Sequence, residues 1–256
     1  AATVFADDDL FVKIGDEKYL KGELFASVPT KRIKNIIYPT TGCPLIIKRG
    51  EFTNMLVRVP GVSTIGYAAL SLKTNNDKIN QTYPLTFVSS TYNPTYGLHK
   101  IKFKVPSYIP VDMYDLRIVI PSAGIIDIQY NSVKVVASYP TSVKFAVLSD
   151  THFNNPTGYW SPANLNQGGF NAYTIALQTI KELRNSDIDF AILTGDVNFG
   201  FDYQYEYEGS WGIWSKAGFP VFMVPGNHDG MTCKVPRTVL GIYSPKRDGL
   251  DFWRSY

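Results

Sequence analysis

Three short segments of the chain combine residue types that bind divalent metal ions. They are Asp150-Thr-His152, Gly195-Asp196 and Gly226-Asn-His-Asp229. Carboxylate, imidazole and amide ligands together suit ions such as Mn, Fe and Zn. Two such ions about 3.5–4 Å apart bind the attacking and the leaving oxygen of a phosphoryl displacement and lower the pKa of bound water toward about 7. The three segments therefore predict metal-dependent hydrolysis of a phosphate ester.

Each segment directly follows a short apolar run, at residues 144–148, 189–193 and 220–224. Runs of this length, bounded by polar residues, are typical of buried strands. Residues 205–217 leave room for a helix, although Gly209 and Gly212 weaken that prediction. Right-handed crossovers would make the three strands parallel neighbours, so that their polar ends meet at one edge of the sheet. Another helix is predicted between the first two runs by apolar residues on one face, namely Tyr173, Ala176, Leu177, Ile180 and Leu183.

In this order and at these strand ends, the segments resemble the motifs of the calcineurin-like metallophosphoesterase superfamily, over roughly residues 144–229. The resemblance implies the first half of an αββα sandwich and a dinuclear centre of Mn, Fe or Zn ions whose bound hydroxide attacks phosphorus. It also implies that Asp150 and His152 hold the first metal ion, that Asp196 bridges both ions and that Asn227 binds the second.

By the same resemblance, His228 is the general acid toward the leaving group and Asp229 orients it. The chemistry agrees with these roles. A general acid must lie within hydrogen-bond reach of the departing oxygen, and a carboxylate behind an imidazole fixes its tautomer. The resemblance implies no cofactor other than the metal ions.

The sequence also departs from the family pattern. Family members have three further histidines after the Asn-His segment, two of them in Gly-His-x-His, whereas this chain has no histidine after His228 and ends at Tyr256. We expect a truncated, cleaved or naturally incomplete catalytic domain whose missing C-terminal half is a partner for the active site. A preceding β-sandwich resembles the layout of purple acid phosphatases, but His152 and Phe199 replace that subgroup's glycine and tyrosine. The match is closer to phosphodiesterase-like members.

The first part of the chain, from about residue 10 to 137, has the pattern of successive strands. His99–Val105 and Tyr114–Ile120 alternate polar and apolar residues, which predicts one solvated and one buried face and places His99 on the solvated face. Seven or more antiparallel strands predict an immunoglobulin-like β-sandwich. We place the domain boundary near Pro140, with a β-sandwich domain at 1–140 and the metallophosphoesterase domain at 141–256. Further strands are expected at Leu45–Lys48, Met55–Val59, Ile65–Lys73, Ile125–Tyr130 and Val133–Val136.

Composition narrows the function classes. The 256 residues are 45% hydrophobic, enough for two domains, and the formal net charge is +3, divided into +5 for residues 1–142 and −2 for the rest. Charge alone gives no strong nucleic-acid-binding signal. The sequence contains no run of 18 apolar residues, so it predicts no transmembrane segment. Cys43 and Cys233 are either a disulfide or two separate thiols.

Localisation and the alternative function depend on the β-rich part. The chain starts at Ala1 without Met, which indicates a removed leader or a trimmed chain, so we expect a secreted or cell-envelope protein. The predicted activity is hydrolysis of a phosphomonoester or phosphodiester substrate. The alternative is a non-catalytic cell-surface binding protein, in which the β-sandwich contacts an envelope component or a polymer and the metal site is degenerate. Loops 153–169 and 198–205 are candidate binding loops.

Overall fold

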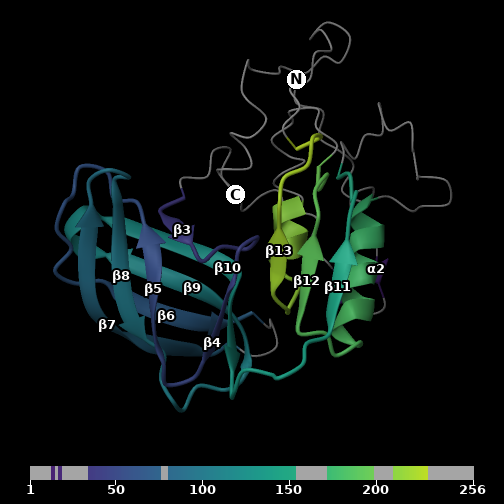
Figure 1. Cartoon of the computed structure of the whole chain (residues 1–256), viewed down its shortest axis with the longest axis horizontal. Helices are drawn as coiled ribbons and strands as arrows, with labels where there is room; N and C mark the ends of the chain where they lie inside the picture. Colours follow the sequence, from purple (N-terminus) through teal and green to yellow (C-terminus); the bar gives the residue numbers. More distant parts are fainter. Residues whose placement is uncertain are drawn as a thin grey trace, which may run out of the picture.

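The computed structural model describes residues 13–14, 17–18, 34–75, 80–153, 172–198 and 210–229. An eight-stranded sheet, here the large sheet, lies beside a three-stranded sheet, here the small sheet (Figure 1). A separate antiparallel pair joins β1 (Lys13–Ile14) to β2 (Glu17–Lys18). The protein is thus mostly β-structure with few helices, and each of the two larger sheets has its own hydrophobic core.

The large sheet is curled and has the strand order β3-β5-β8-β7-β6-β9-β10-β4. Alternation along its strands builds the core: in β8, Ile101 and Phe103 are fully buried, whereas the lysines between and beside them are exposed. The buried side chains of the eight strands form one cluster. The strands are β3 (Ile36–Tyr38), β4 (Leu45–Lys48), β5 (Phe52–Val57), β6 (Ala69–Thr74), β7 (Thr82–Asn93), β8 (Leu98–Lys104), β9 (Asp112–Ile120) and β10 (Ile125–Val136).

This sheet differs from the predicted sandwich in its pairing. All eight strands are hydrogen-bonded into one sheet. Seven of them, from β3 to β10 in the strand order, pair antiparallel as predicted, whereas β4 pairs with β10 in parallel. The predicted strands Ile125–Tyr130 and Val133–Val136 are one strand interrupted by a bulge, where Asn131 has a positive φ of 47°. Strand β7 was not predicted, because its Ser, Thr, Pro and Asn residues are typical of loops.

His99 is a second correction. It is fully buried, not on the solvated face. Its Nε2 lies 2.9 Å from the Val62 carbonyl oxygen and its Nδ1 lies 3.2 Å from the Ser90 hydroxyl. A buried imidazole is tolerated when both ring nitrogens have hydrogen-bond partners, and a sequence pattern contains no information about such partners.

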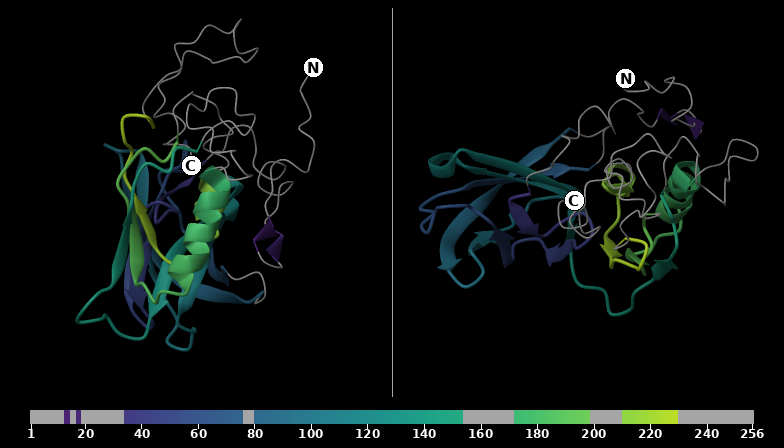
Figure 2. Two further views of the ribbon diagram at one scale, coloured as in Figure 1. Left: turned by 90° about the vertical axis from the view of Figure 1, so that its right-hand side faces the viewer. Right: turned by 90° about the horizontal axis from the view of Figure 1, so that it is seen from above.

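The small sheet has the predicted architecture. Its strands β11 (Phe145–Leu148), β12 (Phe190–Leu193) and β13 (Val221–Met223) are parallel, in that order. Helix α2 (Ala172–Arg184) follows β11, and residues 210–214 are helical before β13. Figure 2 shows α2 covering one face of the sheet, where Leu177 and Ile180 pack into the core. On the other face Phe145 and Val147 are 49% and 59% exposed.

Hydrogen bonds from the large sheet position the residues just before β13. The Asn131 side-chain amide donates to the Phe219 carbonyl oxygen (2.9 Å), and its Oδ1 accepts from the Gly218 backbone N–H (3.0 Å). At the end of the strand, the Met223 N–H donates to the Gly42 carbonyl oxygen (2.8 Å). The strand that leads into the third metal-binding segment is therefore positioned partly by the other sheet.

Asp115 is buried in this contact. Its Oδ1 accepts from the Asn131 backbone N–H (2.8 Å) and from the Asn75 side-chain amide (2.6 Å), and Asn75 also donates to the Ser215 carbonyl oxygen (2.9 Å). Burial raises the pKa of Asp115 to about 6, although these hydrogen bonds and the positive charges of Lys216 and Lys73 oppose the rise. The contact between the sheets thus contains a carboxyl group that is costly to ionise.

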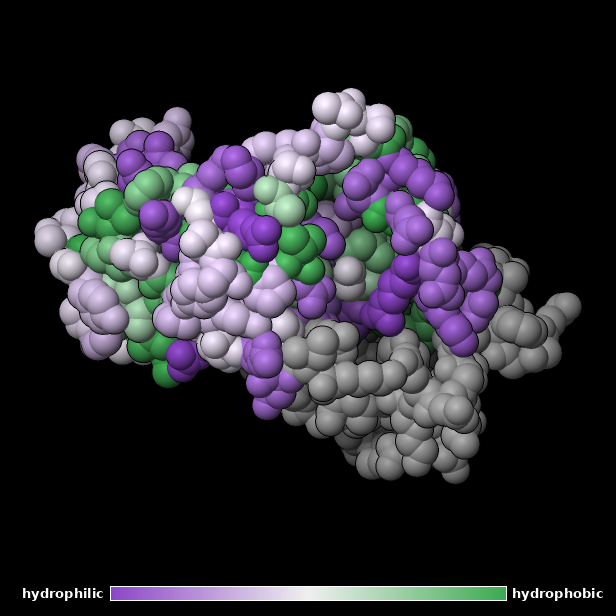
Figure 3. Space-filling view, turned by 90° about the horizontal axis from the view of Figure 1, so that it is seen from below, coloured by the Kyte–Doolittle hydropathy of each residue, from purple (hydrophilic) through white to green (hydrophobic). Residues whose placement is uncertain are grey.

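Within the described ranges, every helix is too short or too polar to cross a membrane. Seen from below, hydrophobic residues lie in separate patches among hydrophilic ones on the large-sheet side (Figure 3).

Candidate metal centre

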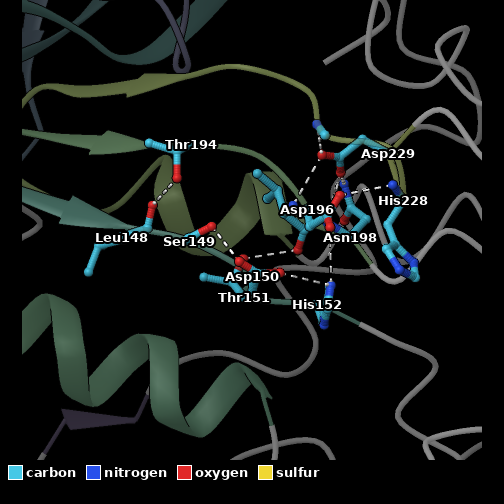
Figure 4. Close-up of polar contacts among 12 residues, drawn as sticks. Leu148, Ser149, Asp150, Thr151, His152, Thr194, Asp196, Asn198, His228 and Asp229 are labelled. Carbon is cyan, nitrogen blue, oxygen red and sulfur yellow. Dashed lines mark hydrogen bonds and ion pairs between the residues drawn. The ribbon is translucent and has the colours of Figure 1, made fainter.

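The site begins where backbone pairing continues beyond the ends of β11 and β12. The N–H groups of Asp150, His152 and Phe153 donate to the carbonyl oxygens of the second segment, at Gly195, Asp196 and Val197, over 3.2, 3.0 and 2.9 Å. The two segments therefore run side by side past the regular strands. This pairing places the side chains of Asp150 and His152 next to Asp196 (Figure 4).

Two glycines allow the second and third segments to approach each other. Gly195 has a φ of +116°, and a Cβ atom there would lie 2.9 Å from the Gly226 Cα atom. A Cβ atom on Gly226 would overlap the Asp196 carboxylate and backbone nitrogen. The glycines in Gly-Asp and Gly-Asn-His-Asp are thus explained by close backbone packing around Asp196.

The residues that face the site have an unusual backbone. Asp150, His152 and Asp196 have φ values of 56°, 45° and 51°, in the left-handed region. Residues other than glycine are uncommon there, and such conformations cost about 1–3 kcal/mol each where the surrounding structure imposes them. All three residues are of types that bind metal ions, and all three lie at one edge of the sheet. The strained backbone therefore lies at the predicted site.

The side chains converge on one point. His152 Nε2 lies 3.7 Å from Asp150 Oδ1 and 3.6 Å from Asp196 Oδ2. Ligand atoms of His152, Asp196 and His228 all lie within 4.8 Å of one another, and the two imidazole rings are 4.8 Å apart. Donors bound to one ion at about 2.0–2.2 Å lie roughly 3–4 Å from each other. Both the spacing and the mixture of carboxylate and imidazole groups fit a divalent cation.

Asp229 organises the backbone around the site. It is fully buried, and its two carboxylate oxygens accept from the N–H groups of Val197 (3.1 Å), Asn198 (2.8 Å) and Gly226 (2.9 Å) and from the Asn198 side chain (3.2 Å). These bonds tie the second segment to the third. Asn198 was not singled out from the sequence, where its position two residues after Asp196 was the only available signal. That Asp229 also orients His228 stays a prediction.

Further polar contacts fix the ligands themselves. The His228 backbone N–H donates to Asp196 Oδ1 (2.9 Å), the Ser149 hydroxyl donates to the Asp150 carboxylate, and the Thr151 hydroxyl donates to the Val197 carbonyl oxygen (3.0 Å). Asp196 is therefore held on one oxygen by the third segment while its other oxygen faces His152.

The structure brings together four of the six predicted site residues: Asp150, His152, Asp196 and His228. Asn227 is exposed in the turn that contains His228, and its role as a metal ligand stays a prediction. The acid role of His228 also stays a prediction. Phe199, Cys233 and the candidate binding loops beyond Phe153 and Asn198 lie outside the described residues.

Comparison with known proteins agrees with the geometry. The sequence model of the calcineurin-like phosphoesterase family matches residues 143–255, so this part of the chain is a calcineurin-like phosphoesterase domain, as the three segments predicted. The match includes all three strand ends that form the site. It supports a divalent-metal hydrolase superfamily without specifying the substrate or the number of ions.

The other comparisons add little. No curated protein matches the sequence. One solved structure that is similar is the purple acid phosphatase PPD1 from seeds of yellow lupin (Lupinus luteus), with 12% sequence identity and a TM-score of 0.34. The alignment covers 77% of this chain and 36% of that one, so this chain spans about a third of its length. At this TM-score the likeness supports no conclusion about fold or function.

Proposed function

We propose that the protein hydrolyses a phosphomonoester or a phosphodiester with the help of two divalent metal ions. The observation that supports this most is the convergence of His152, Asp196 and His228, whose ligand atoms lie within 4.8 Å of one another at the ends of three parallel strands. The calcineurin-like phosphoesterase match at residues 143–255 agrees with it.

In this proposal Asp150 and His152 hold the first ion, Asp196 lies between both ions and Asn227 binds the second. When bound, the ions lower the pKa of water and stabilise negative charge on the phosphate oxygens. Asp196 is suited to a central position because it is held on one side by the His228 N–H and faces His152 with its other oxygen.

His228 is proposed to protonate the departing oxygen. Its backbone is anchored to Asp196, and its ring lies 4.8 Å from the ring of His152, next to the proposed metal ligands. A proton donor in this place would reach a phosphate ester bound at the metal ligands. Asp229 contributes by holding the turn on which His228 lies.

The finer architecture belongs to the same proposal. We propose an immunoglobulin-like β-domain up to about Pro140, then the first half of an αββα domain, in a secreted or cell-envelope protein. The half-exposed apolar side chains Phe145 and Val147 support the αββα arrangement, because a second sheet would cover that face. The β-rich first domain supports export by analogy only.

The test is metal loading followed by an activity assay. The full-length protein is loaded with Mn, Fe or Zn, bound metal is counted by mass spectrometry, and turnover of p-nitrophenyl phosphate and bis-p-nitrophenyl phosphate is measured. We expect metal-dependent turnover of at least one compound. Asp196→Asn should lose bound metal and activity, because a neutral amide replaces the central carboxylate.

Asp187→Asn is the matched control. Asp187 also has a positive φ (50°) but is exposed and precedes β12, at the end of that strand opposite Asp196, so this variant should keep both metal and activity. Wild-type protein that retains metal yet hydrolyses neither compound would argue against an enzyme. Equal metal content in the Asp196→Asn variant and the wild type would argue against the site itself.

A further inference from the structure

A row of three lysines lies on the outer face of the large sheet. Lys100, Lys102 and Lys104 alternate along β8 with the buried residues His99, Ile101 and Phe103. Because alternate side chains of a strand share a face, neighbouring lysines of this lysine row are about 6.6–6.8 Å apart along the strand. Strand β8 lies between β5 and β7, so the row runs within the sheet face and not along its edge.

Within the described parts of the chain, no acidic side chain pairs with the lysine row. Lys102 and Lys104 instead lie over the exposed Phe52 ring, with Nζ atoms 5.3 and 5.2 Å from its centre. The positive charge on this face is therefore available to an anionic ligand.

Polar uncharged groups border the row on the β7 side. The partners of the lysines on β7 are Thr91, Ser89 and Thr86, all exposed, whereas on β5 the partners are Leu56, Asn54 and Phe52. Hydroxyl and amide groups both donate and accept hydrogen bonds, as sugar hydroxyls require. The face thus offers hydrogen-bonding groups beside regularly spaced cations.

At one end the row leads into a hollow of about 440 Å³, here the Tyr96 hollow. Lys100 belongs to both features, and Tyr92, Asn93 and Tyr96 line the hollow. This volume lies within the range of small-ligand sites, about 300–1,000 Å³. Tyr96 is 71% exposed, so a flat ring is presented to solvent next to a cation.

The turn that presents Tyr96 is held in place. Before this turn, Tyr92 pairs with His99, and its ring lies 4.9 Å from the buried His99 ring, on the sheet face opposite the lysines. Asn93 Oδ1 accepts from the N–H groups of Thr95 (3.0 Å) and Tyr96 (3.4 Å), and so fixes the turn that presents Tyr96. A ligand would meet a site that is formed before binding, which reduces the entropy cost of binding.

We propose that this face binds a linear polysaccharide with anionic groups. A sugar ring would pack its C–H face on the exposed Tyr96 ring, and the carboxylates or sulfates of the following sugars would meet the lysine row. A single-stranded nucleic acid would instead require aromatic platforms along the row for successive bases. Here hydroxyls lie along the row, and the Phe52 ring beside it is covered by two lysines.

The experiment measures binding of the purified chain by affinity electrophoresis and calorimetry. The probes are polygalacturonate and dextran sulfate, with methyl-esterified polygalacturonate and plain dextran as their neutral counterparts. We expect an anionic polymer to bind and its neutral counterpart to bind about tenfold more weakly or not at all. The slope of log K against log salt should be no steeper than roughly −3, because three lysines contribute.

Variants locate the site. K100Q/K102Q/K104Q should weaken binding about tenfold or more, and Y96A should weaken it without changing the salt dependence. R49Q/R117Q/K181Q removes the same charge from exposed positions elsewhere and should bind as the wild type does. All these side chains are exposed, so the thermal unfolding midpoints should stay close to that of the wild type, and phosphoesterase activity should be unaffected.

Several outcomes would overturn the proposal. They are no binding to either anionic polymer, equal binding by the two triple variants, and equal binding of anionic and neutral polymers. Tighter binding of poly(dT) would assign the face to nucleic acid, and binding only to phosphatidylglycerol vesicles would assign it to a membrane surface. Since none of these residues belongs to the metal centre, each outcome can be told apart from failure of the proposed hydrolysis.

Discussion

The two sheets use their backbones differently. In the large sheet, long strands with regular alternation build one hydrophobic core, and Asn131, which has a positive φ, lies at a bulge that contacts the small sheet. In the small sheet, short strands end in Asp150, His152 and Asp196, each with positive φ. The regular sheet supplies a hydrophobic core and an outer face of alternate side chains, whereas the irregular strand ends supply converging side chains.

The difference also appears in the buried polar groups. Near the metal centre, Asp229 has four donors around its carboxylate and ties two loops together. At the contact between the sheets, burial dominates for Asp115 and raises its pKa to about 6. The Asp229 carboxylate thus supports the structure around the candidate site, whereas ionising the buried Asp115 carboxyl group destabilises the contact between the sheets. Substitutions can separate these two roles.

The largest effect is expected for Asp229→Ala. The change leaves the buried N–H groups of Val197 and Asn198 and that of Gly226 without this acceptor, and each orphaned donor costs about 1–3 kcal/mol. We expect a loss of roughly 3–5 kcal/mol in the free energy of unfolding, measured in urea, together with weaker metal binding. Asp189→Ala is the control, since Asp189 accepts one exposed bond from Lys144. Equal losses for both variants would contradict the organising role of Asp229.

Asp115→Asn should change the pH dependence of stability. The folded pKa of about 6 lies above the ordinary value of 3.8, so the folded state binds more protons than the unfolded state between these values. The wild type therefore loses stability as pH rises from about 4 to about 6, by roughly 3 kcal/mol at most. The variant keeps an oxygen acceptor and should not show this loss. The free energy of unfolding of both proteins is measured in urea at pH 4, 5, 6 and 7. Parallel pH dependences for the wild type and the variant would refute this role of Asp115.

Gly226→Ala should damage the metal centre more than the fold. The added Cβ overlaps the Asp196 carboxylate, so we expect a loss of about 1–3 kcal/mol and of most metal binding. Gly66→Ala is the matched control, because nothing lies within 4 Å of a Cβ atom there and its φ is not positive. Metal content by mass spectrometry and unfolding in urea distinguish the two. Normal metal binding by the Gly226→Ala variant would show that the close approach around Asp196 is dispensable.

Asn131→Gly should loosen the contact between the sheets. Glycine keeps the positive φ and removes only the two side-chain hydrogen bonds to Gly218 and Phe219. We expect a loss of about 1–2 kcal/mol and faster amide hydrogen exchange in β13. Asp187→Gly makes the same change at an exposed residue of similar φ and should be close to neutral. Unchanged exchange in β13 would mean that the large sheet does not hold this strand.

The three strand-end segments, whose metal binding stays a prediction, were recognisable because each is a local pattern. An apolar run followed by Asp-x-His, Gly-Asp or Gly-Asn-His-Asp is visible within a few residues, and parallel neighbours place such ends together. The β-rich part was predicted only coarsely. Strand β7 was missed because its composition is typical of loops, and His99 was placed on the wrong face because its partners Val62 and Ser90 are distant in sequence.

The sequence by itself determined the strands of the small sheet, the order of the metal-binding segments and the alternation that exposes the lysines of β8. Only the tertiary structure decided that Asp229 joins two segments, that Asn131 holds the start of β13 and that Asp115 is buried between the sheets. The physical reason is the sequence separation over which each interaction acts. Hydrophobic periodicity acts over neighbouring residues, whereas burial and hydrogen bonding of a polar side chain depend on partners that are brought close only when the chain folds.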